Sequence, residues 1–446
     1  MSHLIEHRPL GAGPSRVAFR SALATAAYQS TIATGKKPGA PVGLGLWHSS
    51  AIYAIFIFVL VNLIISPLFS CKREGLTKGE ILSSRYEAMH QGPWSWWIAR
   101  TALLKRPADL VLMGDSQINA AVFQADAYAR LKAVDCAADR ESISLEQLLK
   151  ANTGKSYEVL NLSLGGAVAS DQYLMAKTLF ARALPKVVLI GVSPRCFVDN
   201  SLTSASATDP FQFFAPHVEM GSLSHLAFPD LLSELSFYAK DRLPMWILRD
   251  RFFNLFADTK GNLPVAGTQS TAAKEATATP SQMLRGIYGS ATDVKQGAFL
   301  VSPMIITGFY DNTKEYQHRW RNWDVPAYGI QKKFFDAYLT TLNQLGIKTV
   351  VVGMPCTSEN RQLLPKTFWG EYRDWLTREC LAHGALWFDL SEDPAFGKKH
   401  FLDTVHVNAF GARLLVQKIA SLLVTNPELS RKLKDNGFCQ APSQRL

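Results

Sequence analysis

Five short, largely apolar runs are spread along the chain, and each ends at or near a glycine or a polar residue. Continuous apolar runs of this length are typical of strands in a parallel sheet that is covered on both faces. The predicted strands are residues 109–113, 159–164, 186–191, 348–353 and 385–390.

Segments with helical spacing of apolar residues separate these strands. Residues 172–184 follow the second strand, while 331–345 and 368–383 precede the fourth and fifth. The last two end just before Gly346 and Gly384, as expected where glycine terminates a helix. Alternating strands and helices with right-handed crossovers predict a doubly wound α/β sheet.

Residues 200–325 interrupt this alternation, and we interpret them as an insertion between sheet strands. Residues 211–256 are rich in Phe, Leu, Trp and Met, whereas 266–281 are rich in Ala, Thr and Ser, as in a loop or linker.

The stretch from residue 46 to 69 is apolar enough and long enough to cross a bilayer as a helix, with Asn62 its one strongly polar residue between 51 and 66. A secretory signal peptide is the alternative, but it would need a shorter leader than the 46 residues found here. Five Lys and Arg precede the stretch, which favours a cytoplasmic N-terminus. The body of the protein would then lie outside the cytoplasm.

This gives a predicted domain order. It comprises a cytoplasmic tail (1–45), a transmembrane helix (46–70), a membrane-proximal helical linker (71–108), a catalytic domain with the insertion (109–424) and a C-terminal tail (425–446). Within the linker, Trp94, Trp96 and Trp97 are expected either to pack in the core or to meet the bilayer surface or a membrane partner.

Composition excludes several classes of protein. With 446 residues, 47% of them hydrophobic, the chain is too long and too apolar to be disordered. Six cysteines are too few for a disulfide scaffold, and their pairing cannot be deduced. The net charge of +10 is scattered rather than gathered with aromatic residues, so we expect no nucleic-acid partner.

Candidate chemistry begins directly after the first predicted strand, at Gly114-Asp115-Ser116. Ligands of doubly wound sheets bind beyond the carboxyl ends of the strands. A serine hydroxyl needs a neighbouring base, and Asp403-Thr404-Val405-His406 offers a histidine with a carboxylate to orient it. We therefore predict that Ser116, His406 and Asp403 form a catalytic triad. The alternative interpretation of the Ser116 segment is an ordinary helix-capping turn.

Acyl chemistry also needs hydrogen-bond donors for the oxyanion that forms during the reaction. The turn containing Gly166 is expected to supply a backbone N–H, and the hydroxyl of Ser193 is a second candidate donor. No Cys or His spacing indicates a metal site, and we expect no cofactor.

The ordered set of motifs resembles the SGNH/GDSL hydrolase superfamily. The resemblance rests on Gly114-Asp115-Ser116, on Asn161 followed by Gly166, and on Asp403 to His406. It implies a flavodoxin-like three-layer sandwich in which Gly166 belongs to the oxyanion site. The family's third block, Gly-x-Asn, stands here as Gly191-Val192-Ser193.

Within that superfamily the chain is similar to the DltD-like, membrane-anchored polysaccharide O-acyltransferases. The similarity rests on the span, on the Ser193-Pro194 motif, and on Met354-Pro355 followed by Asn360-Arg361. It implies a bacterial inner-membrane protein with an extracytoplasmic catalytic domain, a polytopic MBOAT acyltransferase as partner and a polysaccharide acceptor. Two alternatives stay open: a carbohydrate esterase or deacetylase, and a non-catalytic accessory subunit.

Overall fold

The computed structural model describes residues 53, 56–62, 76–78, 81, 94–105, 108–136, 139–181, 184–242, 300–301, 309–323 and 325–435. The chain divides into two compact units between residues 64 and 65. In the first unit residues 56–62 are helical, and the apolar side chains from Phe56 to Leu60 are exposed. Most of the predicted span lies outside the described residues, and among those described no helix combines the length and apolarity needed to cross a membrane.

A parallel five-stranded sheet organises the second unit, in the order β3-β1-β4-β6-β7. Counted along the chain these strands lie in the order 2-1-3-4-5, which is the flavodoxin-like arrangement. The predicted α/β class and parallel sheet are therefore confirmed. The strands are β1 (Leu110–Gly114), β3 (Val159–Asn161), β4 (Val187–Val192), β6 (Lys348–Gly353) and β7 (Leu386–Asp389).

Alternate residues of each strand face opposite hydrophobic clusters, because side chains along a strand point to alternate sides. On β1, Val111 and Met113 join one cluster, while Leu110 and Leu112 join the other. Every residue of β1 and β4 is buried. This double burial explains why the strands are continuously apolar in sequence.

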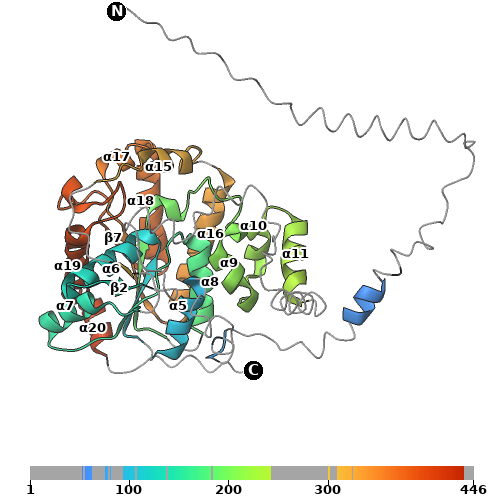
Figure 1. Ribbon diagram of the computed structural model, residues 1–446, viewed down its shortest axis with the longest axis horizontal. Helices are drawn as coiled ribbons and strands as arrows, with labels where there is room; N and C mark the ends of the chain where they lie inside the picture. Colours follow the sequence, from blue (N-terminus) through green and yellow to red (C-terminus); the bar gives the residue numbers. More distant parts are fainter. Residues whose placement is uncertain are drawn as a thin grey trace, which may run out of the picture. The chain divides into compact units, whose positions relative to one another are not determined.

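Helices cover both faces of the sheet, which gives three layers (Figure 1). On one face α6, α7 and α19 pack against one another, with α20 beside α19. On the other face α8 packs against α16, and α18 contributes to the same core. The bounds are α6 (Ser116–Arg130), α7 (Ile143–Thr153), α8 (Ala169–Leu179), α16 (Pro326–Gln344), α18 (Lys366–Ala382), α19 (Ala409–Thr425) and α20 (Pro427–Lys434).

The insertion is built of short helices in its described parts, and α9 packs against α8 and α5. A short antiparallel pair, β2 with β5, also ties the end of the insertion to the segment after α6. The remaining elements include α5 (Trp94–Leu104), β2 (Val134–Asp135), α9 (Asp209–Phe214), α10 (Ser224–Ala227), α11 (Leu231–Arg242), β5 (Leu300–Val301), α15 (Thr313–Arg319) and α17 (Ser358–Arg361). Short 3-10 turns include η2 (Pro194–Cys196) and η6 (Lys398–His400).

The tryptophans of α5 belong to the core. Trp96 and Trp97 are buried, with exposures of 1% and 9%, and their rings meet edge to face. Of the two interpretations of this cluster, core packing is the one the structure supports. The domain boundaries given above stay predictions.

Candidate active site

Ser116 stands at the carboxyl edge of the sheet, where β1 passes directly into α6. Asp115 is the N-cap of α6, and its buried carboxylate accepts a hydrogen bond from the N–H of Gln117. Gly114 makes the turn possible: its φ is +139°, and a Cβ there would lie 2.5 Å from the carbonyl oxygen of Gly191. The serine is therefore presented at a helix N-terminus, where backbone N–H groups favour developing negative charge.

Asp403 and His406 lie in the loop before α19 and meet Ser116. The Nδ1 of His406 is 2.7 Å from a carboxylate oxygen of Asp403, and its Nε2 is 2.9 Å from the hydroxyl oxygen of Ser116. The other carboxylate oxygen of Asp403 accepts from the backbone N–H groups of Val405 and His406. The structure thus brings the three predicted triad residues into one hydrogen-bond chain.

The pKa shifts of Asp403 and His406 fit this geometry. Burial raises the pKa of Asp403, but His406 and the hydrogen bonds outweigh it, so the net pKa lies below the usual range and the group is a carboxylate. Burial lowers the pKa of His406, yet Asp403, together with Asp115 and Glu315, outweighs burial and the net pKa is raised above 6.5. A neutral ring that donates from Nδ1 to Asp403 accepts at Nε2, as proton removal from Ser116 requires.

Three polar residues hold the histidine loop in place. The side-chain oxygen of Asn312 accepts from the N–H of Thr404 at 3.0 Å and also from its hydroxyl. The amide of Asn360 donates to the Thr404 hydroxyl at 2.9 Å. Asn408 caps α19 through the N–H groups of Phe410 and Gly411. Sequence reasoning gave Asn312 no role, because it lies in the insertion, about 90 residues before its partner.

Gly165 and Gly166 form the turn between β3 and α8, beside the nucleophile. A Cβ on Gly165 would lie 4.0 Å from the Cβ of Ser116. Gly166 has a φ of +82°, a backbone conformation that residues other than glycine rarely adopt. The turn thus brings backbone close to Ser116 with no side chain between them.

Ser193 has a different place from the one expected. Its buried hydroxyl donates to the Asp115 carboxylate at 2.9 Å. A hydroxyl has one proton to give, so in this arrangement Ser193 supports the N-cap beneath the nucleophile and has no proton left for an oxyanion. This corrects the oxyanion or substrate-binding role that the sequence suggested.

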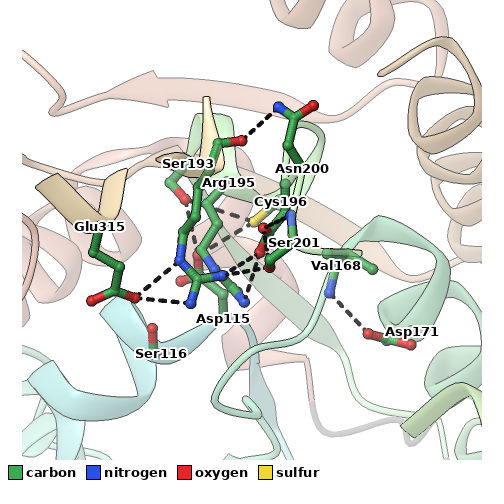
Figure 2. A network of polar contacts seen from close by, with 12 residues as sticks. Asp115, Ser116, Val168, Asp171, Ser193, Arg195, Cys196, Asn200, Ser201 and Glu315 are labelled. Atoms are coloured by element: carbon green, nitrogen blue, oxygen red, sulfur yellow. Dashed lines mark hydrogen bonds and ion pairs between the residues drawn. The ribbon is translucent and has the colours of Figure 1, made fainter. Parts of the chain in front are cut away.

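Two arginines share one buried carboxylate next to this site (Figure 2). The Asp199 carboxylate lies 3.2 Å from an Nη of Arg195 and 2.6 Å from an Nη of Arg319. Arg319 also pairs with Glu315 at 2.8 Å. Burial raises the pKa of Asp199, but the two arginines outweigh it and hold the net pKa below the usual range. Nothing in the sequence singles out Arg195, since one arginine after a Ser-Pro pair has no distinctive spacing.

Within the part of the chain that the structure describes, Asp336, Glu379 and His383 could each offer one ligand atom to a metal ion. His383 is already paired with Asp336 at 2.8 Å. These residues belong to α16 and the end of α18, and none was among the predicted site residues.

The chain has a distant likeness to solved structures. No family model and no curated protein matches the sequence. Among solved structures, the chain is similar to an active-site mutant of a family two carbohydrate esterase from Clostridium thermocellum in complex with celluohexase. The identity is 9% and the TM-score 0.26; the match covers 73% of this chain and 66% of that one.

Proposed function

We propose that this protein is a membrane-anchored serine acyltransferase that transfers an acetyl or similar acyl group to a hydroxyl of an envelope or secreted polysaccharide. The observation that carries the proposal is the hydrogen-bond chain from Asp403 through His406 to Ser116. A serine activated by an oriented histidine is suited to forming an acyl-enzyme.

The reaction divides into two balanced steps. First, His406 takes the proton of Ser116 while the serine oxygen attacks the acyl carbonyl, and the leaving group departs with that proton. Second, His406 takes the proton of an acceptor hydroxyl, whose oxygen attacks the acyl carbon and releases Ser116 as the free alcohol. The backbone N–H groups of Ser116 and Gly166 are the proposed oxyanion donors in both steps.

Water in place of the sugar hydroxyl would make the same site an esterase, since both reactions share the acyl-enzyme. Transfer is preferred because the apolar stretch 46–69 suits an enzyme that receives acyl groups at a membrane. The exposed apolar side chains of Phe56, Ile57 and Val59 on a helical segment support such an anchor. An MBOAT protein in the bacterial inner membrane is the proposed source of the acyl group, with the catalytic domain on the periplasmic side.

The test uses the full chain in detergent with p-nitrophenyl acetate, with and without an oligosaccharide acceptor. We expect an acyl mass on Ser116, acylated sugar when acceptor is present, and loss of both in Ser116→Ala. Ser421→Ala, an exposed serine on α19, is the matched control. Free acetate without acylated sugar would identify an esterase. Polymer acylation that persists in cells carrying Ser116→Ala would identify an accessory subunit.

A further inference from the structure

The oxyanion site is short of a side-chain donor. Two backbone N–H groups are proposed above, and the Ser193 hydroxyl is committed to Asp115 at 2.9 Å. Acyl-transfer sites gain much of their rate from donors aimed at the developing oxyanion. A further donor close to the Gly165–Gly166 turn would complete the site.

The guanidinium of Arg195 lies close to that turn. Arg195 lies in η2, directly after β4, and its side chain is 7% exposed. One Nη lies 3.2 Å from Asp199, whereas the other, Nη1, is buried and has no hydrogen-bond partner among the described residues. A buried guanidinium N–H without a partner is costly, so an anionic group that accepted from it would be stabilised.

The guanidinium lies beside the turn that faces the nucleophile. A Cβ on Gly166 would meet Nη2 of Arg195 at 3.8 Å, and a Cβ on Gly165 would lie 4.0 Å from that of Ser116. Figure 2 shows Arg195 within the same group of side chains as Asp115 and Ser193.

The surrounding charges keep this group in place and ionised. Burial lowers the pKa of Arg195, but Asp199, Tyr316 and Asp115 outweigh it and the net pKa is raised. Asp199 is also held by Arg319 at 2.6 Å. The cation is thus fixed before any substrate arrives, and a fixed donor needs no reorganisation during the reaction.

We propose that Arg195 is a catalytic residue whose guanidinium donates to the oxyanion formed when Ser116 attacks an acyl group. This rests on the proposed function, because it assumes that Ser116 is the nucleophile. A cation at this position would stabilise the anionic tetrahedral state more than the neutral ester, so its loss should lower the rate of chemistry and leave substrate binding nearly unchanged.

The test is inactivation of the full chain in detergent by ethyl p-nitrophenyl methylphosphonate. In that reaction the Ser116 oxygen bonds to phosphorus, p-nitrophenolate leaves, and the serine proton passes to His406. The phosphoryl oxygen takes the place of the oxyanion. The rate constant for p-nitrophenolate release is measured for wild type, Arg195→Met, Arg195→Lys and Arg319→Met, together with each melting temperature and the site of the added mass.

Arg319→Met is the matched control. It removes the other arginine from Asp199, yet every nitrogen of Arg319 already donates to Glu315, Asp199 or Ser201. We expect about 100-fold to 1,000-fold slower labelling in Arg195→Met, partial recovery in Arg195→Lys, and less than tenfold change in Arg319→Met.

Each outcome is decisive. If Arg195→Met is labelled at the wild-type rate, or loses no more than Arg319→Met, the role of Arg195 is refuted while Ser116 keeps its own. If wild type gains no mass at Ser116, the proposed function fails first. Should Arg195→Met not fold, Arg195→Lys decides alone: labelling at the wild-type rate refutes the proposal, and labelling at least tenfold slower with an unchanged melting temperature supports it.

Discussion

The Nε2 of His406 lies 2.9 Å from the hydroxyl oxygen of Ser116, although 290 residues separate them in the chain. Two helices bring these residues together: Ser116 is the first residue of α6, and the loop that contains His406 leads into α19. These helices pack against each other on one face of the sheet, with Ile118 and Ala412 in the same apolar cluster. Because the packing places both helix starts at the carboxyl edge, the base reaches the nucleophile without any local sequence contact.

Asp403→Asn should abolish most activity while preserving the fold. The Asn side-chain oxygen can still accept from the N–H groups of Val405 and His406, so we expect a melting temperature close to wild type. Its amide would donate toward Nδ1 and leave the proton of the ring on Nε2, the wrong tautomer for a base. The acylation rate should fall by about 10⁴. A loss below tenfold would show that Asp403 does not orient the histidine.

Activity should rise with pH as the ring of His406 loses its proton. Asp403, Asp115 and Glu315 raise the pKa of this histidine above its ordinary 6.5, although burial opposes them. Only the neutral ring accepts the serine proton, so the rate is low in acid and reaches its plateau above the raised pKa. The measurement is the rate of Ser116 acylation between pH 5 and 9. A midpoint below 6.5 would contradict the assignment.

Ser193→Ala tests whether Ser193 supports the N-cap residue Asp115 or takes part in catalysis. The variant removes one donor from the buried Asp115 carboxylate, so we expect a loss of about 1–3 kcal/mol in the free energy of unfolding. Since the hydroxyl faces Asp115 rather than the reacting carbonyl, the acylation rate should fall by less than tenfold. Urea denaturation and acylation kinetics on the same preparation test both parts. A 100-fold loss of the acylation rate in a stable variant would show that the Ser193 hydroxyl donates to the oxyanion after all.

Gly114→Ala should strongly destabilise the protein, because the added methyl group would lie 2.5 Å from the Gly191 carbonyl oxygen and 2.7 Å from Ile118. Overpacking of this kind costs about 1–3 kcal/mol, and the positive φ adds strain. Gly370→Ala is the opposite case: the glycine is exposed in α18 with open space around it, so we expect a gain of about 0.5–1 kcal/mol. Melting temperatures that change in the same direction for both variants would contradict this.

The regular part of the fold was predictable because the central strands β1, β4 and β6 are buried on both faces and therefore have a continuous apolar pattern. Predicted residues 348–353 coincide with β6, and β1, β4 and β7 begin or end within one residue of expectation. The helix predicted over residues 172–184 was displaced: α8 covers Ala169–Leu179 instead. Its N-terminus depends on the side chain of Asp171 accepting from the N–H of Val168, a contact that apolar periodicity does not reveal.

The sequence by itself determined the α/β class and picked out Ser116, Asp403 and His406, because apolar runs and a carboxylate three residues before a histidine are local features. Only the tertiary structure decided where Ser193 donates its proton and that Asn312 holds the histidine loop. It also decided that one buried guanidinium nitrogen of Arg195 has no partner among the residues that the structure describes. Those facts depend on contacts between residues far apart in the chain or on opposite sides of a turn. Side-chain hydrogen bonds are directional and short, so composition and spacing cannot fix them until packing has placed both partners.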